Sequence, residues 1–201
     1  MKSLNLPNRL TLLRVCMIPF IIVIPMISSL KANILFGGVN LSDLIVLIIF
    51  IIASFTDFLD GYIARKNNIV TDFGKFMDPL ADKLLVFSAF VVLMELGRIP
   101  GWIVMIIIAR EFLVMGIRVL AAGNQVVIAA SMLGKLKTNS QMLAVIILLL
   151  NNYPFTLIAG LNYGDGQNII GTAILYLAAI LTIVSGVDYF IKNKDVILKT
   201  K

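Results

Sequence analysis

Long apolar stretches, separated by short segments rich in glycine or polar residues, dominate the sequence. They cover residues Val15–Leu30, Leu41–Arg65, Gly74–Leu96, Pro100–Ala122, Leu136–Leu150 and Gly166–Ile191. A helix needs about 20 mostly apolar residues to cross a bilayer. Continuous runs of this kind favour helices, whereas a transmembrane barrel would have short alternating segments. The pattern predicts an all-α integral membrane protein with six transmembrane helices, no strands, and a single membrane domain over residues 1–201.

The composition agrees with a membrane protein and excludes several kinds of chemistry. Of the 201 residues, 60% are apolar and 14% are charged, whereas soluble domains have about 45–50% apolar and about 25% charged residues. The chain has no histidine, which excludes histidine-based acid–base catalysis and imidazole metal sites. Its single cysteine, Cys16, excludes disulfide frameworks and thiolate metal clusters.

The net charge of +6 is spread between the apolar segments instead of forming one cluster. Membrane topology and anionic lipid explain this distribution better than nucleic acid, so we expect no nucleic-acid partner. With both termini in the cytoplasm, six spans leave only Lys31 and Arg98 of the 17 Lys and Arg residues outside. The positive-inside rule therefore predicts a multi-pass protein of the cell membrane with cytoplasmic termini.

Two pairs of aspartates lie at the cytoplasmic ends of the second and third predicted spans. Asp57 and Asp60 are three residues apart, and Asp78 and Asp82 are four apart, so each pair shares a helix face. Four converging carboxylates near a membrane require compensating charge. Mg²⁺ and Mn²⁺ prefer oxygen ligands, and two such ions could hold a diphosphate during a displacement at phosphorus. The spacing therefore indicates a candidate metal and phosphate site that faces the cytoplasm.

Small residues accompany these aspartates. Gly61 and Ala64 continue the face of the first pair, and Gly74 lies one turn before the second pair, so together they leave room for a pocket. The alternative interpretation is that the aspartates form interfacial salt bridges with nearby basic residues. The candidates are Arg65, Lys66, Lys75 and Lys83.

The segment from Asp57 to Asp82 reads Asp-x2-Asp-Gly-x2-Ala-Arg-x8-Gly-x3-Asp-x3-Asp, which resembles the signature of the CDP-alcohol phosphotransferase family at every fixed position. The resemblance implies a six-helix membrane enzyme, usually a homodimer, in which an alcohol displaces CMP from a CDP-linked donor. It implies that the four aspartates bind two divalent cations, Mg²⁺ or Mn²⁺, and that Asp82 is also the general base. The residues that it implies for the nucleotide site, besides Asp57, Asp60 and Asp78, are Gly61, Ala64, Arg65 and Gly74.

Three other segments resemble the phosphatidylglycerophosphate synthase branch of this family: Asn5–Arg14, Ala109–Arg118 and Gly134–Thr138. The resemblance implies CDP-diacylglycerol as the donor and glycerol 3-phosphate as the acceptor, with phosphatidylglycerophosphate and CMP as products. In the first segment, Asn8 and Thr11 form one polar stripe with Arg14, and we assign the first two to the nucleotide site. Capping of the first helix is the alternative role for both.

A set of basic residues is expected to bind the phosphate of the acceptor: Arg110, Arg118, Lys135 and Lys137. Arginine within an apolar helix is costly and usually has a polar role. Arg110 and Arg118 are separated by about 80° around a helix, so both can face one cavity and offer bidentate contacts. Glu111, almost in line with Arg118, is expected to hold that arginine. For all four residues, ordinary positive-inside charge is the alternative interpretation.

Two other functions remain open on the sequence alone. Within the same family, the acceptor could be inositol phosphate, serine or a second lipid. An ion-coupled transporter could also carry intramembrane carboxylates, although transporters place such sites near the bilayer midplane and often between repeated halves. The sequence has no visible repeat, and its aspartates lie at the ends of spans.

Overall fold

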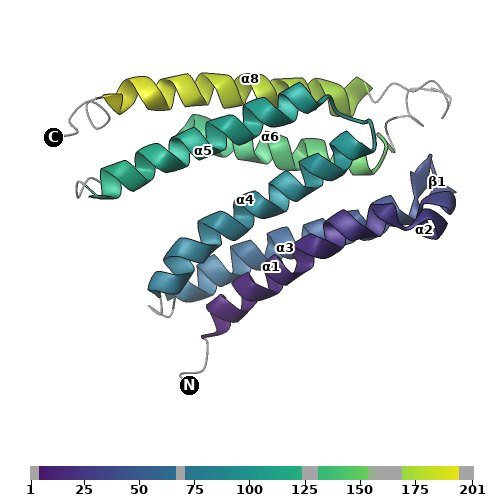
Figure 1. The fold of residues 1–201 in the computed structure, drawn as a ribbon, viewed down its shortest axis with the longest axis horizontal. Helices are drawn as coiled ribbons and strands as arrows, with labels where there is room; N and C mark the ends of the chain where they lie inside the picture. Colours follow the sequence, from purple (N-terminus) through teal and green to yellow (C-terminus); the bar gives the residue numbers. More distant parts are fainter. Residues whose placement is uncertain (1–4, 67–70, 124–130, 154, 156–168, 195–201) are drawn as a thin grey trace.

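The computed structural model describes residues 5–66, 71–123, 131–153, 155 and 169–194. Within these ranges there are six long helices: α1 (Leu6–Val23), α3 (Leu41–Lys66), α4 (Asp72–Glu95), α5 (Gly101–Gly123), α6 (Met132–Leu149) and α8 (Ile169–Lys192). In the elongated bundle, α1 packs on α3 and α4, while α8 packs on α5 and α6 (Figure 1). Successive long helices run in opposite directions, so α1 begins, α3 ends and α8 ends towards the same end of the molecule (Figure 1).

Local chemistry determines where several of these helices begin and end. The Thr71 hydroxyl accepts a hydrogen bond from the backbone N–H of Gly74 at the start of α4. The Ser131 hydroxyl accepts one from Gly134 at the start of α6. Each cap satisfies a backbone donor that the first helical turn leaves free. Asn151, with a φ of 51°, follows the end of α6, and asparagine tolerates this left-handed conformation better than most residues.

The first helix differs from the predicted span Val15–Leu30, because α1 begins at Leu6 and ends at Val23. Pro7 fits the first turn, where its missing N–H costs no hydrogen bond. The predicted span began too late because polar residues occupy the first half of the helix and face the interior. A rule based on continuous apolar sequence cannot recognise a helix that buries polar side chains.

The prediction that no strands are present is wrong for one short connection. After η1 (Ile24–Met26) and α2 (Ser28–Ala32), the strands β1 (Ile34–Phe36) and β2 (Val39–Asn40) form an antiparallel hairpin. Gly37 and Gly38 connect them with φ values of 57° and 72°. Consecutive residues with positive φ are characteristic of tight hairpin turns, and glycine adopts this conformation without steric cost. The rest of the regular structure described is helical.

The other predicted spans lie within four residues of the observed helix boundaries, although Gly166 lies outside the described residues. Within the described residues, three segments are long and apolar enough to cross a membrane: Leu6–Met26, Leu41–Ile63 and Ile170–Lys192. The helix α4 contains six charged residues, α5 has three of them within nine residues near its middle, and the first half of α6 is polar. The described residues thus form a mostly helical membrane protein.

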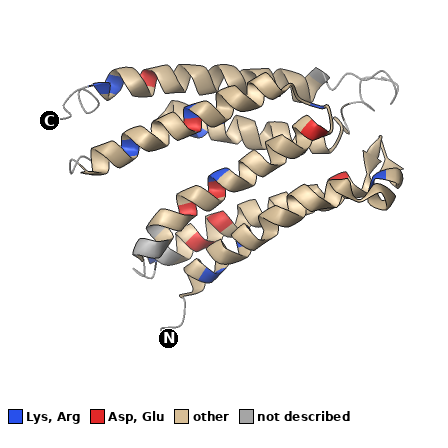
Figure 2. Ribbon diagram, in the orientation of Figure 1, with Lys and Arg blue, Asp and Glu red and all other residues tan. Residues whose placement is uncertain are grey.

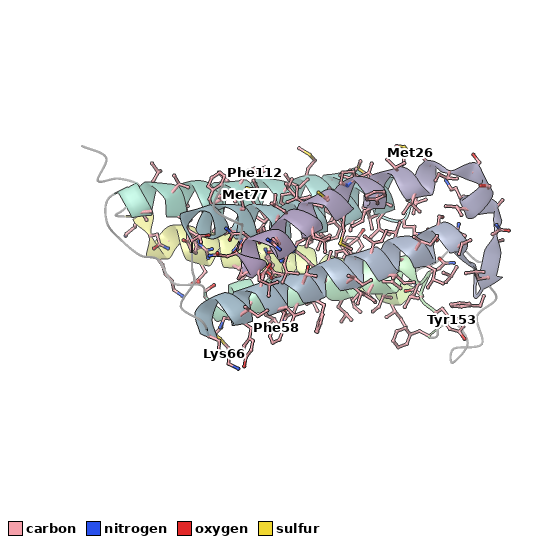
Figure 3. The ribbon with its side chains drawn as sticks, turned by 90° about the horizontal axis from the view of Figure 1, so that it is seen from below. Met26, Phe58, Lys66, Met77, Phe112 and Tyr153 are labelled. Atoms are coloured by element: carbon pink, nitrogen blue, oxygen red, sulfur yellow. The ribbon has the colours of Figure 1, made fainter. Side chains whose placement is uncertain are left out.

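All six long helices contribute to one apolar core, whose largest side chains include Phe50, Phe90 and Leu148. Other large apolar side chains point outward, among them Phe58 and Phe112, which are 67% and 59% exposed (Figure 3). Extensive exposed apolar surface marks contact with a membrane or another apolar partner. An outer surface of this kind is suited to lipid chains.

Candidate active site

Acidic residues of α3 and α4 gather towards the end of the bundle at which α1 begins (Figure 2). There, the side chain of Arg14 lies between the two aspartates of α3. Its Nη1 atom donates to Asp57 Oδ1 at 2.6 Å and its Nη2 atom donates to Asp60 Oδ2 at 2.5 Å. The side chains of Arg14 and Asp60 are buried, whereas that of Asp57 is 41% exposed. A single guanidinium group therefore fixes the spacing of two carboxylates that are one helical turn apart.

The other two residues of the polar stripe on α1 contact the start of α4. Thr11 donates from its hydroxyl to Asp78 Oδ1 at 2.7 Å, and Asn8 Oδ1 accepts from the Thr71 hydroxyl at 2.9 Å. The N-cap residue of α1 is Asn5, and it makes no capping hydrogen bond with its side chain. Capping of α1 is therefore not the role of Asn8 and Thr11. Both instead connect α1 to the residues around the second aspartate pair.

Gly74 lies where α1 approaches α4 closely. A Cβ atom at this position would be 3.2 Å from Asn8 Oδ1 and 3.6 Å from Asp78 Oδ2. The structure therefore brings Gly74 together with Asn8 and Asp78, as expected for one site. Gly61 lies on α3 next to Asp60, while the side chains of Ala64 and Arg65 are outside the described part of the chain.

The salt-bridge alternative is wrong for two of its four basic residues. Lys83 pairs with Glu111 instead of an aspartate, and Lys66 lies over the Tyr62 ring, 5.7 Å from its centroid. The side chains of Arg65 and Lys75 are outside the described residues. Asp57 and Asp60 are in ion pairs, but with the buried arginine of α1. Both carboxylates face the buried guanidinium of α1, which explains this difference, because interfacial lysines would have to reach inward to replace it.

Three of the four aspartates are held by polar residues of α1. Asp57 and Asp60 both pair with Arg14, and Asp78 accepts from Thr11, while Asp82 lies about one turn beyond Asp78 on α4. As the described side chains are arranged, no three acidic groups surround one point. Arg14 supplies a single positive charge against four carboxylates that are rich in oxygen ligands for hard cations. The oxygen donors therefore suit divalent cations by their chemistry, although the described carboxylates are not arranged around one ion, and the binding of such ions stays a prediction.

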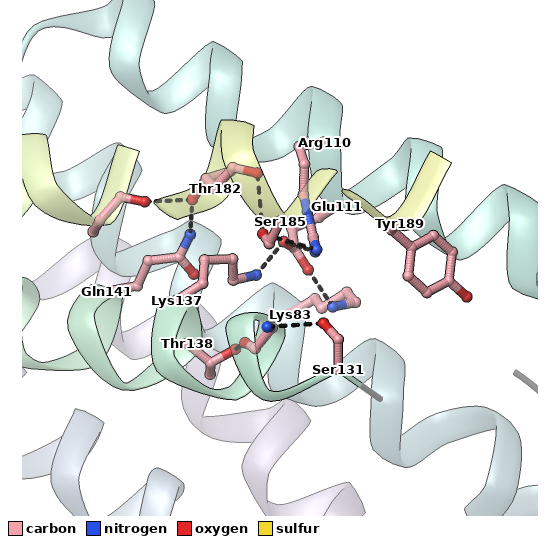
Figure 4. Close-up of polar contacts among 12 residues, drawn as sticks. Lys83, Arg110, Glu111, Ser131, Lys137, Thr138, Gln141, Thr182, Ser185 and Tyr189 are labelled. Carbon is pink, nitrogen blue, oxygen red and sulfur yellow. Dashed lines mark hydrogen bonds and ion pairs between the residues drawn. The ribbon is translucent and has the colours of Figure 1, made fainter. Parts of the chain in front are cut away.

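A second cluster is organised by Glu111, a buried residue of α5 (Figure 4). Its carboxylate accepts hydrogen bonds from Lys83 Nζ at 2.5 Å, from Arg110 Nη1 at 3.0 Å and from Lys137 Nζ. These cations come from α4, α5 and α6. Because three positive charges share one negative charge, the cluster has an excess of positive charge inside a low-dielectric environment. Such an excess favours an anionic ligand.

This cluster lines a cavity of about 750 Å³. The predicted acceptor residues Arg110, Arg118, Lys135 and Lys137 all contribute to its wall. Asp82, the last aspartate of the motif, lines the same cavity and has no hydrogen bond or ion pair with the residues that the structure describes. The arrangement brings a carboxylate that can accept a proton next to a basic surface that can hold a phosphate.

Comparison with known proteins agrees with this geometry. A model of the CDP-alcohol phosphatidyltransferase family matches residues 4–184. The chain belongs to this family. The resemblance found in the aspartate motif is thereby confirmed for nearly the whole chain.

The relatives of this chain include three proteins with the name CDP-diacylglycerol–glycerol-3-phosphate 3-phosphatidyltransferase. The protein from Bacillus subtilis is 46% identical over 198 residues, which are 98% of each chain. The protein from Rickettsia typhi is 42% identical over 186 residues, covering 92% of this chain and 95% of its own. The protein from Haemophilus influenzae is 37% identical over 190 residues, covering 92% and 91% respectively.

Among the described residues, Glu111 and Arg118 do not form the expected contact. Arg118 instead donates from Nε to the Tyr189 hydroxyl at 3.3 Å, with its guanidinium carbon 5.7 Å from the centre of the tyrosine ring. Seven residues along a helix correspond to a rise of about 10.5 Å. Glu111 therefore pairs with cations at its own height along the axis of α5. Arg118 pairs with Tyr189 on α8.

Several residues of this phosphatidyltransferase site were missed by the sequence interpretation. Gln141 Nε2 donates to Thr182 Oγ1 at 3.1 Å, and Arg110 Nη2 donates to Ser185 Oγ at 3.1 Å. Thr182, Ser185 and Tyr189 occur at intervals of three and four residues, so they share one face of an otherwise apolar helix. This spacing is the signal that could have identified them.

Proposed function

We propose that this chain transfers the phosphatidyl group of CDP-diacylglycerol to glycerol 3-phosphate, giving phosphatidylglycerophosphate and CMP. The names of the relatives that align over nearly the whole chain support this activity. The structural observation that carries the proposal is that Asp82 lines the same cavity as the basic residues of α5 and α6. Transfer to a phosphorylated alcohol requires two features: a base that accepts the proton of its hydroxyl, and a surface that binds its phosphate.

The charge of the cavity favours glycerol 3-phosphate over an acceptor without a phosphate. Glu111 balances only part of the charge of Lys83, Arg110 and Lys137, and Arg118 adds a further guanidinium at the wall. Phosphate is well matched by arginine because the guanidinium donates two parallel hydrogen bonds. Serine would leave this positive charge unpaired, whereas inositol phosphate and a lipid that carries a phosphate remain competitors.

Two divalent cations, Mg²⁺ or Mn²⁺, would be held by Asp57, Asp60, Asp78 and Asp82. When bound, such ions would neutralise the diphosphate of the donor and stabilise the negative charge on the departing CMP. Arg14 and Thr11 would keep the carboxylates of α3 and α4 correctly oriented through the contacts described above. The nucleotide would contact Asn8, Thr11, Gly61, Ala64, Arg65 and Gly74.

In the chemical step, Asp82 would accept the proton of the primary hydroxyl of glycerol 3-phosphate. The resulting oxygen nucleophile attacks the phosphorus that carries diacylglycerol, the new P–O bond forms, and the bond to CMP breaks. The leaving group departs with the electron pair of that bond. Arg110, Arg118, Lys135 and Lys137 would hold the acceptor's own phosphate, which stays intact throughout.

The proposal places the site on the cytoplasmic side of the cell membrane, with six spans and with both termini in the cytoplasm. The positive-inside rule supports this orientation. CDP-diacylglycerol would then enter laterally from the inner leaflet, and glycerol 3-phosphate would arrive from the cytoplasm. Family membership supports a homodimer embedded in membrane lipid.

A CMP-release assay on the purified protein tests the function. We expect release with CDP-diacylglycerol and glycerol 3-phosphate in Mg²⁺ or Mn²⁺, loss of release in EDTA, and little release with serine or glycerol. Preference for inositol 1-phosphate would overturn the assignment of the acceptor. Release in detergent, where no ion gradient exists, would also exclude the transporter alternative.

A further inference from the structure

Two arginines that line the cavity are held by the last helix, α8. Arg110 donates to the Ser185 hydroxyl at 3.1 Å, and Arg118 donates to the Tyr189 hydroxyl at 3.3 Å. Ser185 and Tyr189 are four residues apart and so share a face of α8. We propose that α8 positions both arginines for the acceptor's phosphate, with Ser185 and Tyr189 as positioning residues. This inference rests on the proposed function, because it assigns the support of the same acceptor site.

The orientation of the Ser185 hydroxyl fits this role. Ser185 is fully buried and donates its hydroxyl hydrogen to the backbone carbonyl of Thr182 at 3.2 Å. The lone pairs of its oxygen are therefore free to accept from the Arg110 guanidinium (Figure 4). Thr182 in turn accepts from Gln141 on α6. A buried polar chain thus connects α6, α8 and the arginine of α5.

The path of the Arg110 side chain is also fixed by close packing on α8. A Cβ atom at Gly186 would lie 3.0 Å from Arg110 Cγ and 3.6 Å from its Nε. Any larger residue would have to displace the stem of the arginine, because Cγ is near the backbone and cannot move alone. The absence of a side chain at Gly186 is therefore what allows Arg110 to run along the helix.

Tyr189 holds Arg118 in two ways. Its hydroxyl accepts from Nε, and its ring lies under the guanidinium, with the carbon 5.7 Å from the ring centroid. The tyrosine is 4% exposed, while Arg118 is an exposed residue at the cavity wall. A buried ring beneath an exposed cation restricts the motion of a side chain that would otherwise lose much conformational entropy on binding.

These contacts should act on acceptor binding more than on chemistry. Arg110 is shared between Glu111 and Ser185, so loss of the serine hydroxyl lets the guanidinium follow Glu111. Donors that are already in place bind a ligand more tightly because less ordering occurs on binding. Weaker binding of the acceptor's phosphate should raise KM for that acceptor. The proton transfer to Asp82, and with it kcat, should stay unchanged.

The test compares Ser185→Ala and Tyr189→Phe with the wild-type protein in a CMP-release assay. A hydrogen bond to a charged group predicts that each variant raises KM for glycerol 3-phosphate by about tenfold, with kcat and KM for CDP-diacylglycerol close to wild type. Tyr189→Leu, which also removes the ring, should raise KM further. Tyr176→Phe is the matched control, because Tyr176 lies on the same helix but packs against Trp102.

A glycine pair provides a second, independent measurement. Gly186→Ala should raise KM for glycerol 3-phosphate, whereas Gly116→Ala should not, because a Cβ atom at Gly116 meets nothing within 4 Å. If Gly186→Ala does not fold, as judged by size-exclusion chromatography, the acceptor KM values of Ser185→Ala and Tyr189→Phe decide whether α8 positions the arginines.

Unchanged acceptor KM in both hydroxyl deletions would overturn the inference, and so would a fall in kcat with unchanged KM. If wild-type protein turns over another phosphorylated acceptor in place of glycerol 3-phosphate, the proposed function fails. The same variants are then compared with that acceptor, so the positioning role of α8 stands or falls independently.

Discussion

Two arginines lie towards opposite ends of the helical bundle and differ in the charges around them. Arg14 lies between Asp57 and Asp60, beside two further aspartates of α4. Arg98, between α4 and α5, pairs with the buried Asp43 at the start of α3 and donates to the Leu148 carbonyl at 2.8 Å. Its charge is matched one to one, and its second terminal nitrogen, Nη1, donates to backbone. The first arrangement leaves charge for a ligand, whereas the second joins α3 and α6 to the connection between α4 and α5.

This difference gives a physical criterion for separating functional from structural ion pairs. A buried pair with balanced charge and satisfied hydrogen bonds has nothing left to bind. The Arg14 region has excess negative charge, and the Glu111 cluster has excess positive charge. The proposed donor and acceptor sites correspond to these two imbalances. The pair between Arg98 and Asp43 has no such excess, so it serves as the control for both proposed sites.

The largest effect is expected from Asp82→Asn. Removing a general base lowers the rate by about 10²–10⁴-fold, so most turnover in the CMP-release assay should be lost. Binding of CMP, measured by calorimetry, should be retained in part because the other three aspartates remain. Wild-type turnover in this variant would remove Asp82 from the mechanism.

At the other end, Arg98→Met should act on stability instead of turnover. Leaving the Asp43 carboxylate buried without its partner should lower the free energy of unfolding by about 3–5 kcal/mol. Thermal unfolding in detergent measures the loss. The control is Lys192→Met, because the exposed pair between Lys192 and Asp188 contributes about 0–1 kcal/mol. Equal destabilisation by the two variants would contradict the structural role of Arg98.

Divalent cations should distinguish the two arginines directly. In Arg14→Met, the unneutralised carboxylates should destabilise the protein in EDTA, and Mg²⁺ should restore stability by about 2.7 kcal/mol at 100 times its Kd. Arg98→Met should respond to the same Mg²⁺ concentration no more than wild type does, because its aspartate site is unchanged and the single Asp43 carboxylate adds no second site. Unfolding temperatures with and without Mg²⁺ test this. The same Mg²⁺ response in both variants would refute the difference in charge balance.

The smallest effects are expected from a pair of glycines. Gly74→Ala brings a Cβ atom to 3.2 Å from Asn8 Oδ1, and overpacking of this kind should raise KM for CDP-diacylglycerol by about fivefold. Gly97→Ala meets no neighbour but must adopt a φ of 70°, so it should cost about 1 kcal/mol of stability and leave both KM values unchanged. Kinetics and thermal unfolding of each variant separate these outcomes. A kinetic defect in Gly97→Ala would be contrary to the assignment.

The sequence predicted the helices well where hydrophobicity was continuous, as in α3 and α5. It failed at α1, because Asn8, Thr11 and Arg14 are polar residues buried within a helix. The aspartate motif could be recognised because its members are close in sequence and share helix faces. Their buried partner Arg14 is 43 residues from Asp57, so periodicity within one helix could not identify the pair.

What the sequence determined by itself is the set of helices, the family and the two candidate clusters of acidic and basic residues. These follow from short-range patterns, since hydrophobicity and helical spacing act within a few turns. Only the tertiary structure decided which charges pair: Arg14 with the aspartates of α3, Glu111 with three cations, and Arg118 with Tyr189. Partners on different helices are selected by packing and by the cost of burying an unpaired charge. That selection depends on the fold as a whole.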